Sequence, residues 1–428
     1  MANTATIDRT LLLRLFVPFA LGYFLSYLYR VVNAVIAPDL VDDLGVGPGD
    51  LGLLTSSYFL TFALFQLPLG VLLDRYGPRR IEGFLLLFAA LGAAVFAMSD
   101  SVSGLVVGRG LIGFGVSACL MAAFKAFVDW LPPERLPLAN GIQMAAGGMG
   151  ALSATAPVQW LLHITDWRGL FMLLAVLSLL VAAVVWFVVP DRSREGPQSS
   201  LQGQLRGTVD VFTSRLFWQI APLAVLSQAS FLSIQGLWAG PWLRDVGGFE
   251  RGTVANVLLL IAAAMVAGFL LLGAAAERLA RCGIPTKTLA AVGMSLFLVA
   301  QIGIWIAPQG GEIALWLAFG FLGTTGILSY AALSQLFPKQ LAGRVNTALH
   351  MSALVPASVA PLSMPAVVRL SESAETPGYP PTAYRASLGM RVVFQVFTAV
   401  GDCCTDFHEN RTRSGLLLAP LKSCGLVS

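Results

Sequence analysis

The sequence is poor in charged residues. Only 12% of its 428 residues are Asp, Glu, Lys or Arg, which is roughly half the share found in soluble domains. Hydrophobic residues make up 56% of the chain, and the mean hydropathy is +0.76. A water-soluble fold could not bury this much apolar surface, and a disordered chain has the opposite balance. The composition therefore excludes a soluble enzyme and a nucleic-acid-binding domain.

Other features that the sequence lacks narrow the choice further. It has five cysteines, of which Cys119 stands in an apolar run and three lie in the last 26 residues, so no disulfide framework is visible. The net charge of +4 does not suggest a polyanion such as a nucleic acid as partner. No nucleotide-phosphate loop, metal-ligand cluster or nucleophile triad occurs. We expect no enzyme activity, no cofactor, no bound metal and no ATP-driven pump.

Long apolar runs are what the chain has instead. A membrane-spanning helix needs about 20 mostly apolar residues, and the first ten residues do not resemble a cleaved signal peptide. The spans that this rule predicts in the first half are Leu11–Ala37, Leu51–Leu73, Ile81–Met98, Val102–Val128, Leu138–His163 and Gly169–Val189. Those of the second half are Leu216–Leu243, Thr253–Ala276, Thr288–Ala307, Ile313–Phe337, Val345–Leu370 and a weaker Tyr384–Val400.

This pattern predicts an all-α membrane protein embedded in the lipid bilayer. Residues 1–189 form one six-helix bundle, 190–214 a polar cytoplasmic linker and 215–400 a second bundle. In the assigned loops, 16 Lys and Arg residues fall on the side of the N-terminus and 5 on the other. Positive loops face the cytoplasm, so we expect a monomeric, multi-pass protein of the inner (plasma) membrane with a cytoplasmic N-terminus.

The two halves repeat one another. Adding 203 to the positions of Gly70, Asp74 and Arg75 gives Gly273, Glu277 and Arg278. A proline followed eight positions later by an asparagine occurs at 132 and 140, and again 206 positions on at 338 and 346. Two six-helix halves in parallel repeat are typical of a transporter architecture whose substrate site lies between the halves.

The loop after the second span carries a recognisable motif, Gly70, Asp74, Arg75, Gly77, Arg79 and Arg80. It resembles the signature of the major facilitator superfamily, and the resemblance covers residues 11 to about 400. The second copy keeps Gly273, Glu277, Arg278 and Arg281 but has Ala280 where the glycine would stand. The segment Arg109, Gly110, Gly113 and Gly115 resembles a second motif of the family. The resemblance implies a secondary transporter with two bundles that rock about a central cavity.

Several charged residues of these loops are candidates for gating. Asp74 at the inner end of its span is placed to stabilise the positive N-terminal end of the helix that begins near Val345, and Arg79 or Arg80 is placed to pair with Asp129. A purely topological role is the alternative, because short basic loops fix orientation. The candidates for gating or coupling are Gly70, Asp74, Arg75, Gly77, Arg79, Arg80, Arg109, Asp129, Glu277, Arg278 and His350.

Ionisable residues within a span are functional candidates because they are costly there. Arg30 lies on a polar stripe of the first span with Tyr23, Ser26, Tyr27 and Asn33. It either binds the substrate or pairs with backbone carbonyls or a tyrosine. For Arg109 we weigh coupling and structure equally, since the resemblance implies both.

The seventh span has a neutral polar face that includes Gln228, Gln235, Trp238 and Trp242. We expect Gln228, Gln235 and Trp238 to contact substrate; the alternative for the tryptophans, above all Trp242, is an outer interfacial belt.

Acidic residues are absent from the middle of the predicted spans, since Glu82 and Asp129 lie at span ends. His350 is the remaining deep titratable group, either for coupling or as a packed structural residue.

Two arginines without a buried acid favour an organic anion as solute, and the match to the organic-anion and sugar-phosphate branches of the family is loose. Any coupling ion is expected to be a proton or sodium. The rival functions are a transport-inactive membrane sensor or scaffold and, less favoured, an ion channel.

The composition changes abruptly at Gly401. The preceding predicted span, Tyr384–Val400, has only 17 residues and includes Arg385 and Arg391. Residues 401–428 form an atypical polar tail. A change of reading frame near Val400, which would leave the last helix incomplete, and a naturally short helix with a polar tail both explain this pattern.

Overall fold

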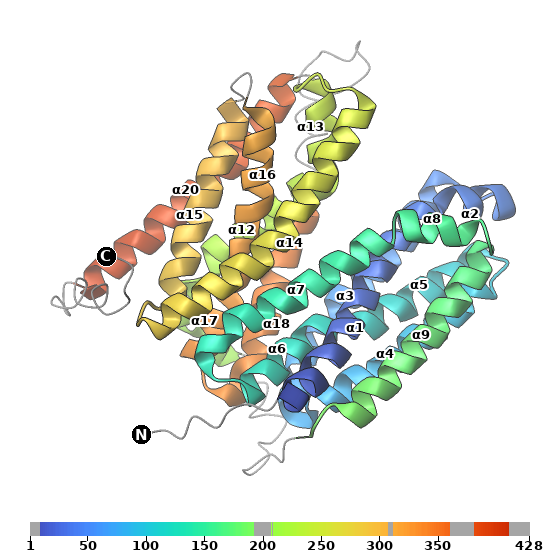
Figure 1. The fold of residues 1–428 in the computed structure, drawn as a ribbon, viewed down its shortest axis with the longest axis horizontal. Coiled ribbons are helices and arrows are strands. Elements are labelled where there is room, and N and C mark those ends of the chain that lie inside the picture. Colours follow the sequence, from blue (N-terminus) through green and yellow to red (C-terminus); the bar gives the residue numbers. More distant parts are fainter. Residues whose placement is uncertain (1–8, 192–206, 208, 307–310, 360–380, 411–428) are drawn as a thin grey trace. The chain divides into compact units, whose positions relative to one another are not determined.

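The structure is a computed structural model that describes residues 9–191, 207, 209–306, 311–359 and 381–410. These residues form helices and their connections and include no strand (Figure 1). Seven helices are long and apolar enough to cross a membrane, or eight if the bent pair Gly49–Gln66 and Pro68–Tyr76 is one span. The prediction of an all-α membrane protein is thus confirmed.

The first half contains uninterrupted and interrupted spans. The uninterrupted helices are α1 (Arg9–Val35), α4 (Pro78–Ala97) and α9 (Trp167–Val188), whereas α3 (Pro48–Tyr76) is bent by 55° between Gln66 and Pro68. The interrupted spans are α5 (Val102–Val116) with α6 (Cys119–Trp130), and α7 (Leu136–Ser153) with α8 (Ala156–Leu162). A short helix that the sequence analysis did not predict, α2 (Ala37–Leu44), follows α1.

The second half follows the same order. Its spans are α11–α13 (Arg215–Trp218, Ala221–Ser233 and Ala239–Asp245, with the π-helical turn η2 at Ile234–Trp238), α14 (Arg251–Arg281), α15 (Thr286–Ile306), α16–α17 (Glu312–Leu322 and Leu328–Leu336, joined by the 3₁₀ turn η3), α18 (Ala342–Val359) and α20 (Pro381–Asn410). Each half of the described chain therefore contributes six helical segments in the order of the predicted spans, and seven or eight of the twelve are long and apolar enough to cross a membrane. α20 continues to Asn410, whereas the predicted span ended at Val400. The predicted linker falls largely outside the described residues, and so does the tail beyond residue 410.

The chain divides into two compact units that exchange one short segment each. The first unit contains residues 1–131, 142–209 and 338–348, and the second contains 132–141, 210–337 and 349–428. The start of α18 thus belongs to the first unit and the start of α7 to the second. The exchanged segments are repeat equivalents, because 132 and 338 differ by the predicted 206 positions.

The backbone repeats closely at these two segments. Leu131 and Phe337 end α6 and α17 with φ near −100° and ψ of 152° and 154°. A proline, a 3₁₀ turn and a new helix follow in both copies, the turns being η1 (Pro133–Arg135) and η4 (Lys339–Leu341).

The repeat also corrects the expectation for the second motif loop. Gly77 connects α3 to α4 with φ of 91°, and Gly283 connects α14 to α15 with φ of 86°. Positive φ is accessible to glycine without steric cost. The glycine of the second copy is therefore Gly283 and not absent at Ala280, because α14 runs about one turn further than the alignment from Gly70 implied.

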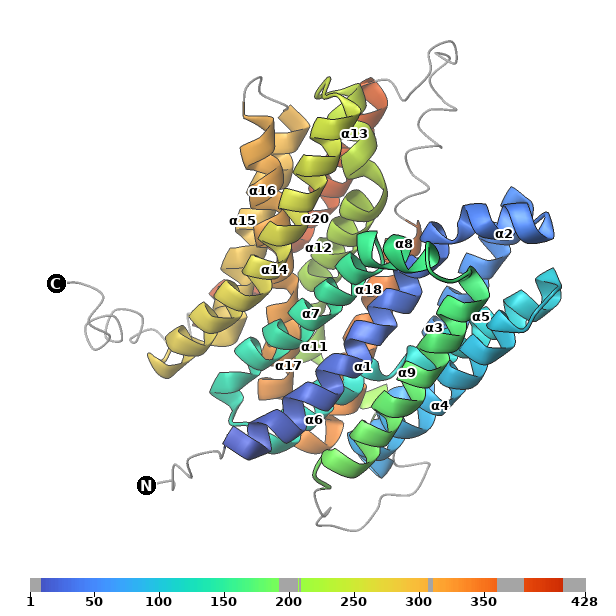
Figure 2. The same ribbon diagram turned by 45° about the vertical axis from the view of Figure 1, so that its right-hand side comes forward.

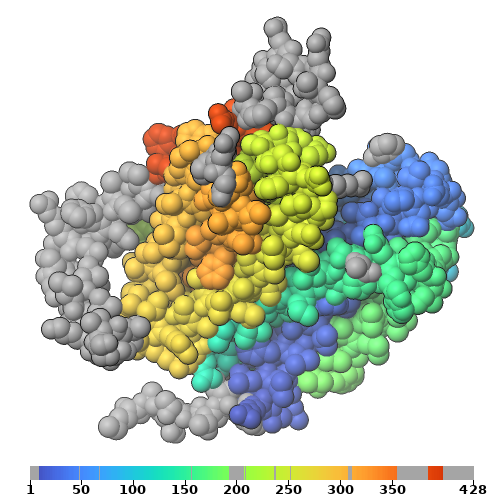
Figure 3. Space-filling view, turned by 45° about the horizontal axis from the view of Figure 1, so that its top comes forward, coloured from blue at the N-terminus to red at the C-terminus, as the bar shows by residue number. Residues whose placement is uncertain are grey.

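Glycines let the helices of the first unit approach closely, and α4, α5 and α9 lie side by side (Figure 2). A Cβ atom on Gly92 would lie 2.7 Å from the Ile112 nitrogen, and one on Gly115 would lie 2.7 Å from Ala89 Cα. In the second unit, α14, α15 and α16 form a continuous surface (Figure 3). Leu260, Leu271 and Val299 are exposed on these helices, as suits contact with lipid.

Polar contacts tie the loops of the first unit together opposite the Asp74 end of α3. Arg168 pairs with Asp43 and, at 2.8 Å, with Asp100, and its guanidinium lies 4.2 Å from the Trp167 ring centroid. Trp167 Nε1 donates to Asp43 at 3.1 Å. Hydrogen bonds from Arg168 and then Trp167 lower the pKa of Asp43, because they stabilise its ionised form.

Replacement of Gly115 tests the helix packing. Gly115→Ala should lower the free energy of unfolding by about 1–3 kcal/mol, because the new methyl group meets the backbone of α4. Gly110→Ala is the matched control, since its Cβ would lie 3.5 Å from the Thr61 methyl group. Thermal unfolding in detergent measures both. Equal effects of the two substitutions would contradict the close approach at Gly115.

Substitution of two neighbouring aspartates of α2 tests the contacts that Asp43 makes with Arg168 and Trp167. Asp43→Asn should lower the Tm at neutral pH, whereas Asp42→Asn should not, since Asp42 is exposed and has no polar partner among the described residues. The lowered pKa of Asp43 means that its contribution is present above the ordinary value of about 3.9 and is lost as pH falls through the folded-state value. The difference between wild type and Asp43→Asn should therefore vanish in acid. A pH-independent difference would mean that the charge of Asp43 is not involved.

Candidate functional site

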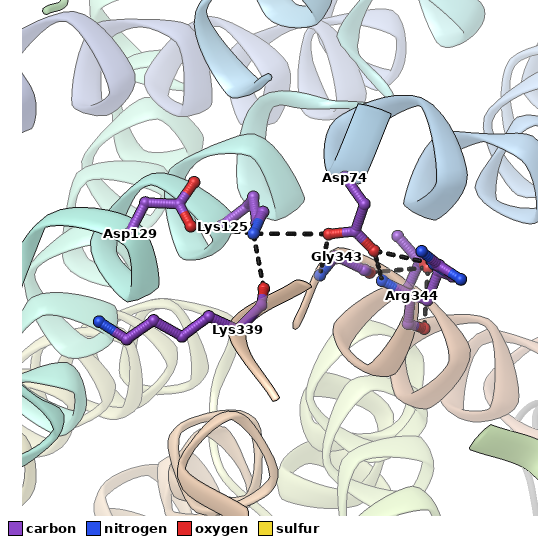
Figure 4. Close-up of polar contacts among 7 residues, drawn as sticks. Asp74, Lys125, Asp129, Lys339, Gly343 and Arg344 are labelled. Atoms are coloured by element: carbon purple, nitrogen blue, oxygen red, sulfur yellow. Dashed lines mark hydrogen bonds and ion pairs between the residues drawn. The ribbon is translucent and has the colours of Figure 1, made fainter. Parts of the chain in front are cut away.

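The carboxylate of Asp74 lies against the first turn of α18 (Figure 4). Gly343 N donates to Asp74 Oδ1 at 3.0 Å, and Arg344 N donates to Oδ2 at 3.2 Å. Arg344 Nε also donates to Oδ2, at 3.0 Å. An anion at this position satisfies backbone donors that have no partner within the helix and interacts favourably with the helix dipole. The predicted location of Asp74 at this helix end is confirmed.

Lys125 completes the cluster of charges. Its ammonium lies 3.5 Å from Asp74 Oδ1 and 2.9 Å from Asp129 Oδ1, and it donates to the Lys339 carbonyl at 2.7 Å. The side chains of Asp74 and Lys125 are 3% and 6% exposed. Salt and water therefore screen this pair much less than a surface pair. We call Asp74, Lys125, Asp129, Lys339, Gly343 and Arg344 the Asp74 cluster.

The partners expected for Asp129 were wrong. Arg80 pairs with Asp191 at 3.0 Å, and Arg79 Nε donates to the Trp186 carbonyl at 2.6 Å. Both arginines follow the turn at Gly77 and point toward the end of α9, so Lys125, one helical turn before Asp129, takes their place. Lys125 was not among the residues predicted for this site, because an (i, i+4) pair on one helix gives no sign of a third partner.

Glycine makes room for the contact between α3 and α18. A Cβ atom on Gly70 would lie 2.8 Å from Arg344 Cα, and one on Gly343 would lie 2.9 Å from the Gly70 carbonyl. The second copy shows the same approach: a Cβ on Gly273 would lie 3.0 Å from the Pro137 carbonyl. There, Glu277 pairs with Arg281 and lies 3.9 Å from Arg135.

Two further arginines of the motifs have no part in these clusters. The Arg75 guanidinium lies 5.3 Å from the Tyr76 ring centroid. Arg278 is exposed and makes no hydrogen bond or ion pair with any residue that the structure describes.

Arg30 lies among aromatic rings in the first unit. Its guanidinium carbon is 4.7 Å from the Tyr27 ring centroid, 5.3 Å from that of Phe62 and 5.8 Å from that of Phe59. Arg30 is half-buried, its Nε has no hydrogen-bond partner, and no carboxylate of the described chain pairs with it. Cation–π contacts of this kind contribute about 0.5–2 kcal/mol each.

The other polar residues of the predicted stripe in the first span make separate contacts. Tyr23 and Tyr27 touch edge to face at 5.1 Å between centroids, and both pack on Gly147 of α7. Asn33 is buried, and its Oδ1 has no hydrogen-bond partner among the described residues. Ser26 donates to the Val116 carbonyl of α5 at 3.5 Å.

Arg109 is 1% exposed and binds the α1 backbone. Its Nη1 donates to the Tyr29 carbonyl at 3.0 Å, and the guanidinium lies 4.7 Å from the Tyr58 ring centroid. This geometry favours a structural role for Arg109 over a role in coupling, because the side chain joins α5 to α1.

The second unit places Gln228 and His350 on one tyrosine. Tyr330 OH lies 3.2 Å from Gln228 Oε1 and 3.2 Å from His350 Nδ1. Three helices, α12, α17 and α18, contribute to this group. Tyr330 was not predicted from the sequence, because it stands in an apolar run and has no partner nearby in sequence.

The other residues of the seventh span lie around its π-helical turn. Gln235 Nε2 donates to Met265 Sδ at 3.4 Å, and π-helical turns are frequent at functional sites. Trp238 lies edge-on to Tyr384, with 6.4 Å between centroids. Trp242 is buried and 5.4 Å from Trp316, so its assignment to an outer interfacial belt was wrong.

Two bundles of six spans, with an exchanged helix start and charged residues at helix ends, define a secondary-transporter architecture. The model of the Major Facilitator Superfamily matches residues 19–361. The chain belongs to this superfamily.

Curated relatives are about a quarter identical to the chain over the residues that align. A protein described as a probable sulfoacetate transporter of Cupriavidus necator is 25% identical over 358 residues, 78% of this chain and 83% of the relative. The hexuronate transporter of Bacillus subtilis is 23% identical over 77% of this chain and 81% of the relative. The hexuronate transporter of Escherichia coli is 24% identical over 55% of this chain and 58% of the relative.

Solved structures of the superfamily share the fold. FucP in the outward conformation superposes with a TM-score of 0.68 at 18% identity, over 90% of this chain and 99% of FucP. A bacterial homologue of the iron transporter ferroportin, in an outward-facing state, gives a TM-score of 0.69 at 15% identity. The match covers 91% of this chain and 98% of the homologue.

Neutralising Asp74 tests its hold on α18. Loss of a charge at a helix end costs about 0.3–2 kcal/mol, which is up to roughly a thirtyfold change in an equilibrium. A cysteine at Thr347, which packs on Gly70, is a suitable reporter in a chain without other cysteines. Asp74→Asn should raise its rate of labelling by a water-soluble maleimide several-fold.

The matched control is Asp191→Asn, which removes only an exposed ion pair with Arg80. Labelling in this control should equal that of the parent. If Asp74→Asn also labels at the parent rate, the carboxylate does not hold the helix start in place and serves topology alone.

Proposed function

We propose that this protein is a secondary transporter that moves a small organic anion across the membrane by alternating access. The observation that carries the proposal is the environment of Arg30, a permanently charged side chain without a carboxylate partner in the described chain. The names of several relatives support the choice of solute, since they specify sulfoacetate, hexuronate and galacturonate.

An anion would stabilise Arg30 more than the present surroundings do. Ring faces attract the guanidinium and the Tyr58 hydroxyl accepts a hydrogen bond from it, but no carboxylate of the described residues engages its planar fork of donors. A carboxylate or sulfonate can accept two parallel hydrogen bonds from that fork. Tyr23 and Tyr27 flank the position and offer hydroxyl groups to the rest of the solute. Asn33 adds a buried amide on the same predicted face.

A second set of polar groups suits a hydroxylated solute. Gln228, Tyr330 and His350 form a connected hydrogen-bond chain, and Gln235 lies in a π-helical turn next to it in sequence. These amide, phenol and imidazole groups both donate and accept, as the hydroxyl groups of a sugar acid require. Within the proposal, Gln228, Gln235 and Trp238 are the solute-contacting residues of the second unit.

The Asp74 cluster is the proposed gate. Its contacts hold the start of α18 against α3 and α6, and separation of that segment would break a charge-assisted hydrogen bond and the buried contact with Lys125. In the orientation expected from the loop charges, this cluster lies on the cytoplasmic side, and the N-terminus does too.

A membrane sensor with the same fold is the rival function. It would bind the same anion without carrying it. Accumulation of solute in reconstituted vesicles separates the two functions, because a sensor binds a stoichiometric amount and no more.

Substitution of Arg30 tests the binding site. In purified protein, galacturonate or sulfoacetate should raise the Tm of wild type, Arg30→Ala should abolish that rise, and Arg30→Lys should keep part of it, since an ammonium lacks the bidentate geometry. Arg215→Ala, which removes an exposed arginine, should respond like wild type. If a neutral sugar stabilises wild type and Arg30→Ala equally and no anion does, the anion proposal is wrong.

A further inference from the structure

A buried carboxyl group in α4 lies outside the Asp74 cluster and outside the proposed solute-binding residues. Glu82 is 0% exposed, and the Cys119 thiol is the one group of the described residues that contacts its carboxyl oxygens as a hydrogen-bond partner. The sequence analysis placed Glu82 at a span end and therefore counted no buried acid. That expectation was wrong, because a position near the end of a helix does not prevent neighbouring helices from covering it.

Three helices enclose the carboxyl group. Glu82 Oε1 occupies the space that a side chain at Gly22 of α1 would need, and a Cβ atom on Gly22 would lie 3.7 Å from Cys119 Sγ of α6. Cys119 is itself fully buried and free of any disulfide. The carboxyl and the thiol thus meet at a position of α1 that has no side chain.

Charged groups on the surrounding helices do not reach Glu82. The acidic and basic residues on α1, α3, α4, α5, α6 and α9 that the structure describes are Arg9, Arg14, Arg30, Asp50, Asp74, Arg75, Arg79, Arg80, Arg109, Lys125, Asp129 and Arg168. None of them interacts electrostatically with Glu82; of the titratable groups, only the Cys119 thiol does. No cation therefore compensates a negative charge on Glu82.

An ionised carboxylate in such a place is costly. With no exposure to solvent, no cation in contact and the weakly donating Cys119 thiol as its hydrogen-bond partner, the charge loses most of its solvation, at an effective cost of several kcal/mol. A neutral carboxylic acid avoids this cost, and an ionisable residue inside a membrane span is a functional candidate for the same reason.

We propose that Glu82 is a proton-binding site and that its carboxyl group releases and rebinds one proton in each transport cycle. The proton leaves to water when the helices around Gly22 separate, which leaves a carboxylate, and it returns from water before they close. This deepens the proposed function, on which it rests, by naming the proton as the coupling ion. Uptake of one proton with a singly charged anion is electroneutral.

Infrared spectroscopy of the reconstituted protein tests proton binding without any solute. Wild type should show a carboxylic-acid carbonyl band that shifts in D₂O and is missing in Glu82→Gln. Cys119→Ser should shift the same band, since it replaces the neighbouring thiol by a hydroxyl. Glu134→Gln, which removes an exposed carboxylate, should leave the band unchanged. If Glu82→Gln and Cys119→Ser both leave the band as in wild type, or if the wild-type band does not shift in D₂O, the proposal is overturned.

Transport in vesicles tests whether the proton moves in the cycle. With galacturonate as the probe, an inward proton gradient should drive accumulation in wild type but not in Glu82→Gln, which should still exchange internal for external galacturonate. Equal gradient-driven accumulation in both proteins would overturn the proposal even if the infrared band belongs to Glu82. Failure of wild type to exchange galacturonate, sulfoacetate or any related anion would instead contradict the proposed function, and the infrared band would still decide the proton site.

Discussion

The hydrogen bonds of one buried carboxylate, Asp74, to the first turn of α18 are the interaction on which much of this structure depends. They require Gly70 and Gly343, because any larger side chain would keep the two backbones apart. They require cations as well, and Arg344 and Lys125 supply them. The start of α18 belongs to the first compact unit for this reason, although the rest of the helix belongs to the second. A helix that is shared in this way can be released by breaking a small number of polar contacts.

The equivalent position in the second half is built from weaker contacts. Glu277 replaces Asp74 and pairs with Arg281 on its own helix, with Arg135 at 3.9 Å. Backbone approach is preserved at Gly273, whereas the buried cation corresponding to Lys125 is not: the residue 206 positions on is Ala331. A repeat that conserves shape but not charge gives the two halves unequal stability at these segments.

The hydropathy of the sequence predicted the spans well, because a helix in lipid must be apolar along about 20 residues. It could not predict where α5 and α6 are interrupted or where η2 forms, since those breaks depend on neighbouring helices. Asp74 was located correctly because its partner is a helix end, which the sequence marks. Lys125, Tyr330 and Glu82 were misjudged because their roles come from side chains distant in sequence and from burial. The repeat misled at Ala280, since an insertion of three residues separates the two registers and only the positive φ of Gly283 reveals it.

Anion transport is the central claim, and uptake of labelled solutes into vesicles tests it most directly. Vesicles that contain the purified protein should take up sulfoacetate or galacturonate in a saturable manner, and unlabelled anion should compete with the label. Neutral fucose should neither enter faster than in protein-free vesicles nor compete. Saturable uptake of fucose without uptake of any anion, or the absence of protein-dependent uptake for every solute while an anion still binds, would contradict the account.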